Sequence, residues 1–308
     1  MSLPSQRLTR PLLMQAIRDA CAMDVQAFKP GNVSLSVPGH GMEARHFLVS
    51  AELIAEPLTE PGASVGQRIF GAIQATRDTL PFNTNLGIVL MIAPLVHAAM
   101  AWRERMTLEA ELRRTLAGLS VQDADLAYRA IRLAEPGGLG TSERHDVRDP
   151  PAVTLLAAMR EAAERDIVAR QYSTGFADVF ELAVPRLRAA RARWDSDEWA
   201  MVATYLTLLA RTPDTHIART HGLAAARQVS DAARLFDALL GDLTHPHELL
   251  PKLRDWDEQL KQRGWNPGAT ADLSVAAELA VKLEDLAGEA STARTAAADR
   301  AAIWHGLA

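Results

Sequence analysis

The sequence contains almost no cysteine: Cys21 is the only one in 308 residues. A single cysteine excludes an internal disulfide and a zinc site built from cysteines. Cys21 stands among apolar residues at helical spacing, so we interpret it as a small core residue. This composition leads us to expect a reducing, cytoplasmic setting.

Uninterrupted apolar segments are scarce. The N-terminus "MSLPSQRLTRPLLMQAIRDA" has no apolar stretch followed by a small-residue cleavage site, so we expect no signal peptide. Residues 80–102 carry no charge and are long enough for a membrane span. However, Asn83, Asn85, Pro94 and His97 would lack partners in lipid, and no second span exists to supply them. This segment therefore predicts a buried central helix and no membrane partner.

The chain has no excess of positive charge. Lys and Arg number 33 against 38 Asp and Glu, a net charge of -5, and basic residues are not concentrated anywhere, which argues against nucleic acid as a partner. The 48% of hydrophobic residues provide a large core. The apolar surplus, with Trp194, Trp199 and Trp256 interpreted as exposed, permits a homodimer without requiring one.

Alternating runs of valine, isoleucine and threonine are missing, so we predict an all-α fold. No linker rich in Gly, Ser or Pro divides the chain, which favours a single domain over residues 1–308. Neither a sustained heptad pattern nor a fixed-period repeat is present, so a coiled coil or solenoid is not supported.

Helical periodicity and capping residues recur in almost every segment. Ser64 is a predicted N-cap, Ser120 forms a predicted capping box with Asp123, and Pro151 is predicted to open a helix at its first position. The predicted helices cover residues 12–27, 43–55, 64–80, 124–135, 151–172, 176–192, 197–211, 223–240, 246–263, 271–287 and 292–306.

Four loops combine glycine or proline with polar groups, at residues 28–42, 135–150, 211–222 and 263–272, and a fifth at residues 81–87 opens the central helix. In helical proteins, binding sites are built from such loops and from inward-facing polar residues. These five loops are therefore the predicted source of a site.

Two of these loops offer groups for an anion. Lys29 stands beside a proline turn that would fix its ammonium near a phosphate or carboxylate, although a solvated surface lysine is the alternative. Asn266, Gly268 and Thr270 stand at a helix start, where free N–H groups and the helix dipole favour phosphate. An ordinary turn with an N-cap is the alternative there.

The segments "NTNLG" and "DTHIAR" share a polar pattern at a helix start. The first segment offers Asn83 and Asn85, and the second offers Asp214 and His216. In each pair, one side chain can cap the helix while the other reaches a ligand. Capping alone is the alternative. Arg219 is a candidate phosphate clamp.

Several nucleotide and metal motifs are missing. The chain has no Walker loop, no GxGxxG and no HExxH, which excludes the common nucleotide folds and argues against zinc. Asp146 and Asp214 could instead supply carboxylates to magnesium, and the nearby His145 and His216 could transfer protons.

Taken in order, these segments resemble the triphosphoribosyl-dephospho-CoA synthase family. The family's Pro-Lys-Pro-Gly turn and Gly-Ala-His segment resemble residues 28–31 with Gly39-His40, and its Asn-Thr-His-Lys-Gly motif resembles residues 83–87. Its Asp-Thr-Asn motif resembles residues 214–216, and its Ser-Pro-Gly-Gly-Ser-Ala-Asp motif resembles residues 266–272. The matches extend over about residues 20 to 280.

The resemblance implies an all-helical enzyme that transfers the triphosphoribosyl group of ATP to the 2′-hydroxyl of 3′-dephospho-CoA, or of a related nucleotide, and releases adenine. Breaking the glycosidic bond develops positive charge on the sugar, so the reaction needs a carboxylate, a base and an acid. The implied catalytic residues are Asp146, Asp214, Asp272 and His40. The implied Mg²⁺ ligands are Asp146 and Asp214, and which carboxylate is the base stays open. The implied substrate-binding residues are Lys29, Asn83, Asn85, His216, Arg219, Asn266, Gly268 and Thr270.

The chain departs from the family pattern. Asn85 and Leu86 replace the family's histidine and lysine, and an expected Gly-Glu-rich loop remains only as "SERHDV". The sequence therefore resembles a divergent branch seen in archaea and methylotrophs. Two alternatives remain: a related magnesium-dependent helical enzyme of C1 or pterin cofactor assembly, or a non-catalytic helical binding protein.

Overall fold

The computed structural model describes residues 8–103 and 106–305, with side chains through Glu289. This part of the chain contains helices and no strand, apart from one isolated bridge between Gly39 and Met42. The predicted all-α class is confirmed. The elements are α1 (Arg10–Gln26), α2 (Ala44–Leu58), α3 (Val65–Thr79), α4 (Leu86–Met100), α5 (Leu108–Ala117), α6 (Val121–Ala134), α7 (Leu155–Ala162), α8 (Ile167–Thr174), a π-helical turn η1 (Asp178–Ala183), α9 (Val184–Trp194), α10 (Asp197–Arg211), α11 (Thr215–His221), α12 (Leu223–Asp242), a 3₁₀ turn η2 (Pro246–Leu249), α13 (Leu250–Gln262) and α14 (Gly268–His305).

Helix α4 is the centre of the core, as the apolar run predicts. Nearly all of its residues are buried, and it packs against α3, α5, α8 and α14. Pro94 has no N–H, so the carbonyl of Leu90 loses its helical partner. The hydroxyl of Tyr172 donates a hydrogen bond to that carbonyl instead, at 2.6 Å. Within the described residues, no helix is long and apolar enough to cross a membrane.

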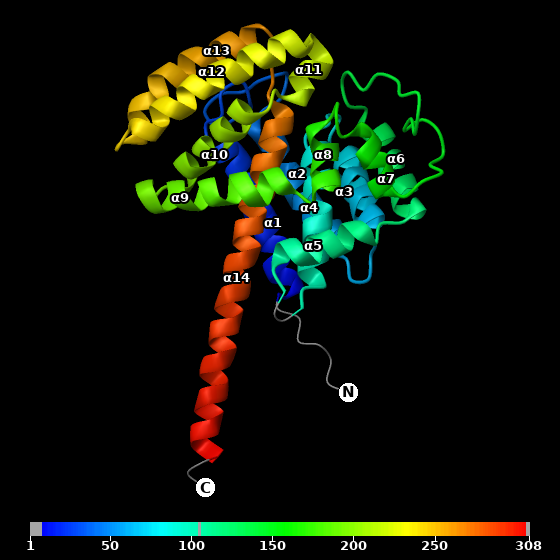
Figure 1. The fold of residues 1–308 in the computed structure, drawn as a ribbon, viewed down its shortest axis with the longest axis vertical. Coiled ribbons are helices and arrows are strands. Elements are labelled where there is room, and N and C mark those ends of the chain that lie inside the picture. Colours follow the sequence, from blue (N-terminus) through cyan, green and yellow to red (C-terminus); the bar gives the residue numbers. More distant parts are fainter. Residues whose placement is uncertain (1–7, 104–105, 306–308) are drawn as a thin grey trace.

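Helix α14 begins inside the core, and its second half leaves the body of the molecule (Figure 1). The predicted break between residues 287 and 292 is wrong, because α14 continues to His305. Gly288 costs a helix only about 1 kcal/mol relative to alanine, and no proline follows to stop it.

The helix predicted over residues 151–172 is two helices. Thr154 caps α7 by accepting from the N–H of Ala157, so α7 begins at Leu155 and not at Pro151. Asp166 then starts α8 by accepting from the N–H groups of Val168 and Ala169. In a continuous helix, these N–H groups would bond to carbonyls one turn earlier. The two capping side chains accept from them instead, so a new helix begins at each cap.

Two predicted helix starts are confirmed. Ser64 accepts from the N–H of Gln67, and Ser120 accepts from the N–H of Asp123, each in a complete capping box. Asp123 also accepts hydrogen bonds from the Ser64 hydroxyl and from the N–H of Gly66, at 2.6 and 2.8 Å. It therefore joins the first turns of α3 and α6.

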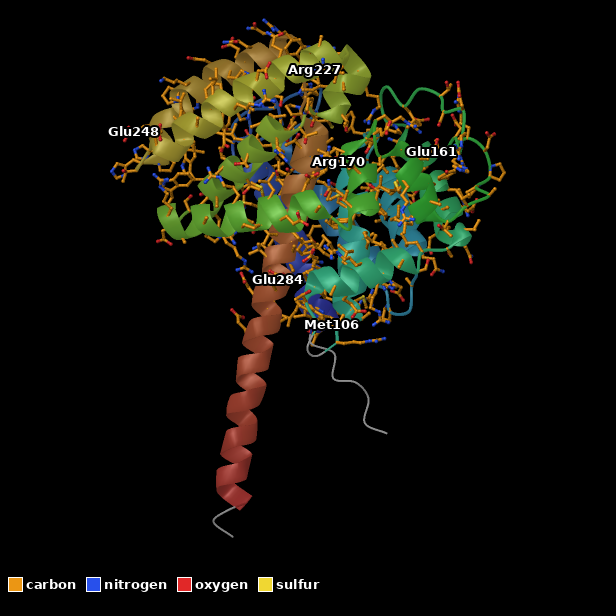
Figure 2. All side chains as sticks on the ribbon, in the orientation of Figure 1. Met106, Glu161, Arg170, Arg227, Glu248 and Glu284 are labelled. Atoms are coloured by element: carbon orange, nitrogen blue, oxygen red, sulfur yellow. The ribbon has the colours of Figure 1, made fainter. Side chains whose placement is uncertain are left out.

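Helices α12 and α13 pair at one end of the molecule, where Glu248 marks the tip (Figures 1 and 2). The rings of Phe236 and Trp256 stack between them, with centroids 4.7 Å apart. Trp256 is buried and Trp194 and Trp199 are half-buried, so the prediction that these tryptophans are exposed is wrong. Cys21 is buried as predicted, and this burial raises the pKa of its thiol.

Candidate functional site

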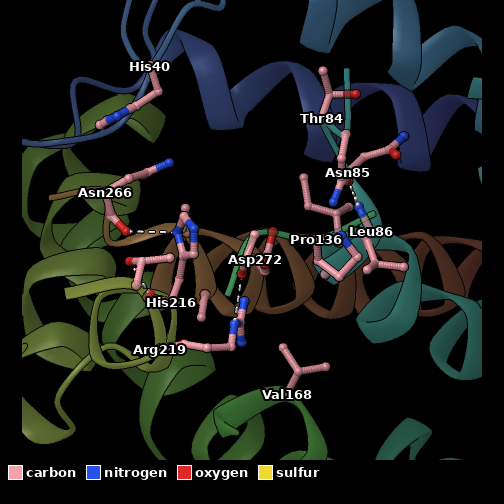
Figure 3. A pocket seen from close by; sticks show the side chains of 18 of the residues that line it. His40, Thr84, Asn85, Leu86, Pro136, Val168, His216, Arg219, Asn266 and Asp272 are labelled. Carbon is pink, nitrogen blue, oxygen red and sulfur yellow. Dashed lines mark hydrogen bonds between the residues drawn. The ribbon is translucent and has the colours of Figure 1, made fainter. Parts of the chain in front are cut away.

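A cavity of about 470 Å³ lies where α1, α11 and the first turns of α4 and α14 meet (Figure 3). All five of the predicted loops reach it, although they are far apart in the sequence. The predicted site residues that line the cavity are His40, Asn83, Asn85, His216, Arg219, Asn266, Gly268 and Asp272.

Lys29 does not line the cavity, so the structure gives no support to its predicted contact with phosphate. Its side chain is completely buried, with Nζ 3.0 Å from Oδ1 of Asp24, and it also donates a hydrogen bond to the Asp24 carbonyl. A buried ammonium requires a fixed anion, and Asp24 on α1 provides it. Asp24 itself lines the cavity, so Lys29 fixes the position of a cavity residue without lining the cavity itself.

The turn after Lys29 is clamped by contacts far along the chain. The Tyr205 hydroxyl donates to the carbonyl of Pro30 at 2.6 Å, and the N–H of Gly31 donates to Asp257 at 2.7 Å. Gly31 has a φ of 82°, and a Cβ there would lie 2.8 Å from Cδ of Pro267, so only glycine fits. His40 donates from Nε2 to the carbonyl of Gly31 at 2.8 Å, which fixes its exposed ring at the rim of the cavity.

Asp214 is completely buried and is not among the residues that line the cavity. Its Oδ1 accepts from the N–H groups of His216 and Ile217, and its Oδ2 accepts from the N–H and the hydroxyl of Thr270 at 2.8 and 2.7 Å. With both oxygens used inside the protein, Asp214 presents no free oxygen to the cavity, and its catalytic and metal-binding roles stay predictions. Asp214 joins the first turns of α11 and α14.

The anion site predicted at the start of α14 is therefore occupied by a carboxylate of the protein. Burial raises the pKa of Asp214 and outweighs the N–H and the hydroxyl of Thr270, which favour the charged form of Asp214, as expected at such a site. Thr270 is buried and holds this carboxylate. Gly268 and Asn266 do line the cavity.

Asp146 lies outside the cavity, in the loop between α6 and α7. Its carboxylate accepts from the Arg148 guanidinium at 2.6 and 2.7 Å and from the N–H of Ser142 at 2.7 Å. These bonds, those of Arg148 first, hold the pKa of Asp146 well below its usual range. Asp146 and Asp214 do not line a common cavity, and no group of three or more potential metal ligands occurs among the residues that the structure describes. The metal role of the two carboxylates stays a prediction.

Asp272 is the predicted catalytic carboxylate that does face the cavity. It lies in the first turns of α14 against Gly87 of α4, where a Cβ on Gly87 would be only 1.9 Å from Oδ2 of Asp272. Burial first, and then the charges of Asp24, Asp214 and Asp166, raise the pKa of Asp272 well above that of an ordinary aspartate. Burial and these charges therefore favour the protonated form of Asp272.

His216 offers the cavity an unprotonated nitrogen. Its Nδ1 donates to the carbonyl of Asn266 at 3.1 Å, since a carbonyl can only accept. Burial, opposed by Asp214 and assisted by Arg219, lowers the pKa of His216. The ring is then neutral at physiological pH, with Nε2 available as a hydrogen-bond acceptor.

Asn83 and Asn85 divide their tasks at the start of α4. Oδ1 of Asn83 accepts from the N–H of Leu86 at 3.1 Å, which confirms that one asparagine caps the helix. The side chain of Asn85 donates to the hydroxyl of Thr76 at 3.1 Å, so its amide nitrogen is held by α3. Both asparagines line the cavity.

Sequence reasoning missed Asp24 and Asp166, which also line the cavity. Asp24 follows Ile17, Ala20 and Cys21 on the buried face of α1, and a carboxylate in an apolar stripe is a signal that could have found it. Asp166 precedes an apolar helix start and is a recognisable N-cap. Its Oδ2 accepts from Arg219 at 3.0 Å.

The cavity is rich in carboxylates. Asp24, Glu135, Asp166 and Asp272 line it, whereas Arg219 is the one arginine or lysine among its described lining residues. A polyanionic ligand therefore needs additional positive charge to enter.

Comparisons with known proteins agree on one family. The family model described as CitG: ATP:dephospho-CoA triphosphoribosyl transferase matches residues 11–291. A curated relative, the 2-(5″-triphosphoribosyl)-3′-dephosphocoenzyme-A synthase of Pectobacterium atrosepticum, is 36% identical over 101 residues. That alignment covers 33% of this chain and 31% of the relative, so about a third of the relative's length is matched.

The fold also has a solved counterpart. A crystal structure described as a triphosphoribosyl-dephospho-CoA synthase from Archaeoglobus fulgidus superimposes with a TM-score of 0.59. The superposition covers 76% of this chain and 97% of the archaeal chain, at 21% sequence identity. At this identity the likeness concerns the fold.

Proposed function

Because the chain belongs to the ATP:dephospho-CoA triphosphoribosyl transferase family, we propose that it transfers the 5-triphosphoribosyl group of ATP to the 2′-hydroxyl of 3′-dephospho-CoA and releases adenine. The observation that carries the proposal is the convergence of the family-like motifs on one cavity. His40, Asn85, Arg219 and Asp272 come from four distant segments and line the same space (Figure 3). The curated relative carries the same activity in its name.

In this reaction the bond from C1′ of the ATP ribose to N9 of adenine breaks, and a bond from C1′ to the acceptor oxygen forms. Asp272, with its raised pKa, is suited to protonate the departing adenine. Nε2 of His216 is suited to accept the proton of the acceptor hydroxyl. The carboxylate of Asp24 lies in the same cavity, where it would stabilise positive charge on the ribose.

Magnesium is proposed to enter with the triphosphate of ATP. Mg²⁺ is commonly held by one or two carboxylates together with substrate phosphates, and it does not need a preformed cage of protein ligands. Glu135 lines the cavity with an exposed side chain, 78% accessible, and is the carboxylate that such an ion would meet. The shortage of cations in the cavity supports this role for the metal.

The product would be the precursor of the prosthetic group of citrate- or malonate-decarboxylating enzymes. Both substrates are intracellular metabolites, so we propose a cytoplasmic site of action. A related magnesium-dependent helical enzyme that acts on another nucleotide is the alternative. Such an enzyme would release adenine only if ATP were its donor substrate.

The direct test is adenine release from ATP, measured by chromatography with and without 3′-dephospho-CoA. We expect adenine and the coupled product in equal amounts, and no reaction after chelation of Mg²⁺. Purified protein that releases no adenine from any combination of ATP, Mg²⁺ and 3′-dephospho-CoA would contradict the proposal. A protein whose turnover survives complete chelation would contradict only the role of the metal.

Gly87→Ala is expected to reduce this turnover strongly, because the new Cβ would overlap the carboxylate of Asp272. A displacement of a reacting group by about 1 Å can cost about 10²-fold in rate. Gly241→Ala in α12 is the matched control, since a Cβ there meets nothing within 4 Å. Steady-state rates of both variants check the expectation, and equal rates would separate Asp272 from the reaction.

A further inference from the structure

A second cavity, of about 550 Å³, adjoins the first, and the proposed reaction has not yet assigned it a ligand. Its walls are α7, α8 and the loop between α6 and α7. Figure 2 marks this region by Glu161 on α7 and Arg170 on α8. The two cavities share the residues Leu90, Ile131, Leu139, Asp166, Val168 and Arg219.

The shared wall contains a fixed ion pair. Asp166 uses Oδ1 to cap α8, with acceptor distances of 2.9 and 3.1 Å from the N–H groups of Val168 and Ala169, and uses Oδ2 to accept from Arg219. Arg219 also donates from Nε to the carbonyl of Gly137 at 3.2 Å. The pair is therefore anchored to three separate elements, and a ligand in either cavity would meet it.

The second cavity combines an apolar floor with a polar rim. Leu90, Leu155 and Met159 are buried and line the floor. The rim is formed by residues 139–147, and this loop is held by the Tyr128 hydroxyl, which donates to the carbonyl of His145 at 2.9 Å. An extended ligand with an apolar arm and a charged end matches this distribution.

Arg165 supplies an available charge at the rim. Among the described residues it donates to neutral oxygens, the Ser142 hydroxyl at 2.9 Å and the Glu161 carbonyl at 3.3 Å, and pairs with no carboxylate. The other arginines of this cavity are paired, Arg170 with Asp178 and Arg219 with Asp166. An exposed guanidinium without an acidic partner is suited to a diphosphate.

We infer that the second cavity binds the acceptor, with its pantetheine arm on the apolar floor and its diphosphate at Arg165, while the first cavity binds ATP. This inference rests on the proposed function, which requires two nucleotides to meet at one carbon. The acceptor hydroxyl then reaches the ATP ribose across the Asp166–Arg219 pair. The first cavity, which holds His216 and Asp272, receives the donor.

The test begins with calorimetric titration of 3′-dephospho-CoA, and separately of Mg-ATP, into the wild-type protein and two variants. Ala162→Trp fills the second cavity from α7, and Arg165→Gln removes the charge at its rim. Each is expected to weaken acceptor binding about tenfold or more, and to leave the affinity for Mg-ATP within about twofold. Arg160→Gln, an exposed arginine of α7 that does not line the cavity, is the matched control.

The outcomes separate the two proposals. If the wild-type protein turns over and both Ala162→Trp and Arg165→Gln keep the wild-type affinity for the acceptor, the second-cavity assignment is overturned. The proposed function is then unaffected. If both variants lose acceptor binding and the wild-type protein shows no turnover, the assignment is supported and the proposed function is overturned. A wild-type protein that does not bind 3′-dephospho-CoA overturns both. If Ala162→Trp does not fold, Arg165→Gln at the exposed rim decides the assignment.

Discussion

Asp272→Asn is expected to reduce adenine release by about 10²- to 10⁴-fold, the range that general acid catalysis usually contributes. The amide has nearly the shape of the protonated carboxyl group, so it fits against Gly87 as Asp272 does. It cannot deliver a proton to the departing base. The measurement is kcat for adenine formation at saturating ATP and acceptor.

The same substitution is expected to stabilise the fold at neutral and alkaline pH. The folded pKa of Asp272 is raised above the ordinary value of 3.8, so the contribution of this group to stability is full below pH 3.8 and is lost as the pH rises through the folded pKa. Asparagine does not titrate. The free energy of unfolding of the variant, compared with the wild type, should therefore improve as the pH is raised from about 4 to 8.

The matched control is Asp285→Asn, on the same helix but exposed and paired with Arg188. It should leave kcat unchanged. If Asp272→Asn retains full activity, Asp272 is not the acid. If instead its stability gain is the same at every pH, the raised pKa is not the reason for that gain.

The helices were predictable where the chain carries its own start signals. Ser64 and Ser120 mark the first turns of α3 and α6, and the run from Asp197 to Arg211 is one helix as expected. The division of residues 151–172 into two helices was harder to predict. It depends on Asp166 accepting from the N–H groups of Val168 and Ala169, which in a continuous helix would bond to backbone carbonyls. Local caps and helical periodicity compete there, and the pattern of apolar residues does not decide between them.

The site was predictable as a set of segments but not as a set of roles. His40, Asn85, His216, Arg219 and Asp272 do line one cavity. Whether a polar side chain faces a ligand or holds another segment depends on partners far along the chain. Asp214 illustrates this, because Thr270, which occupies its Oδ2, is separated from it by α12 and α13. The position of Asp214 before a helix predicted that it caps α11. That position gave no sign that Asp214 also accepts hydrogen bonds from Thr270.

Lys29→Met is expected to destabilise the protein by about 3 to 5 kcal/mol, because it leaves the carboxylate of Asp24 buried without its cation. Lys29 is completely buried and its Nζ lies 3.0 Å from Asp24, whose side chain is also almost completely buried. The measurement is urea unfolding at neutral pH. Lys252→Met, an exposed lysine of α13, is the matched control and should change stability by less than about 0.5 kcal/mol.

The double variant Asp24→Leu/Lys29→Met separates stability from function. Replacing both partners by apolar groups removes the unpaired charge, so most of the lost stability should return. Asp24 lines the cavity, so the double variant should stay inactive despite its recovered fold. A double variant that recovers both stability and turnover would make the pair purely structural. If Lys29→Met unfolds like the wild type and loses only affinity for ATP, Lys29 binds phosphate after all.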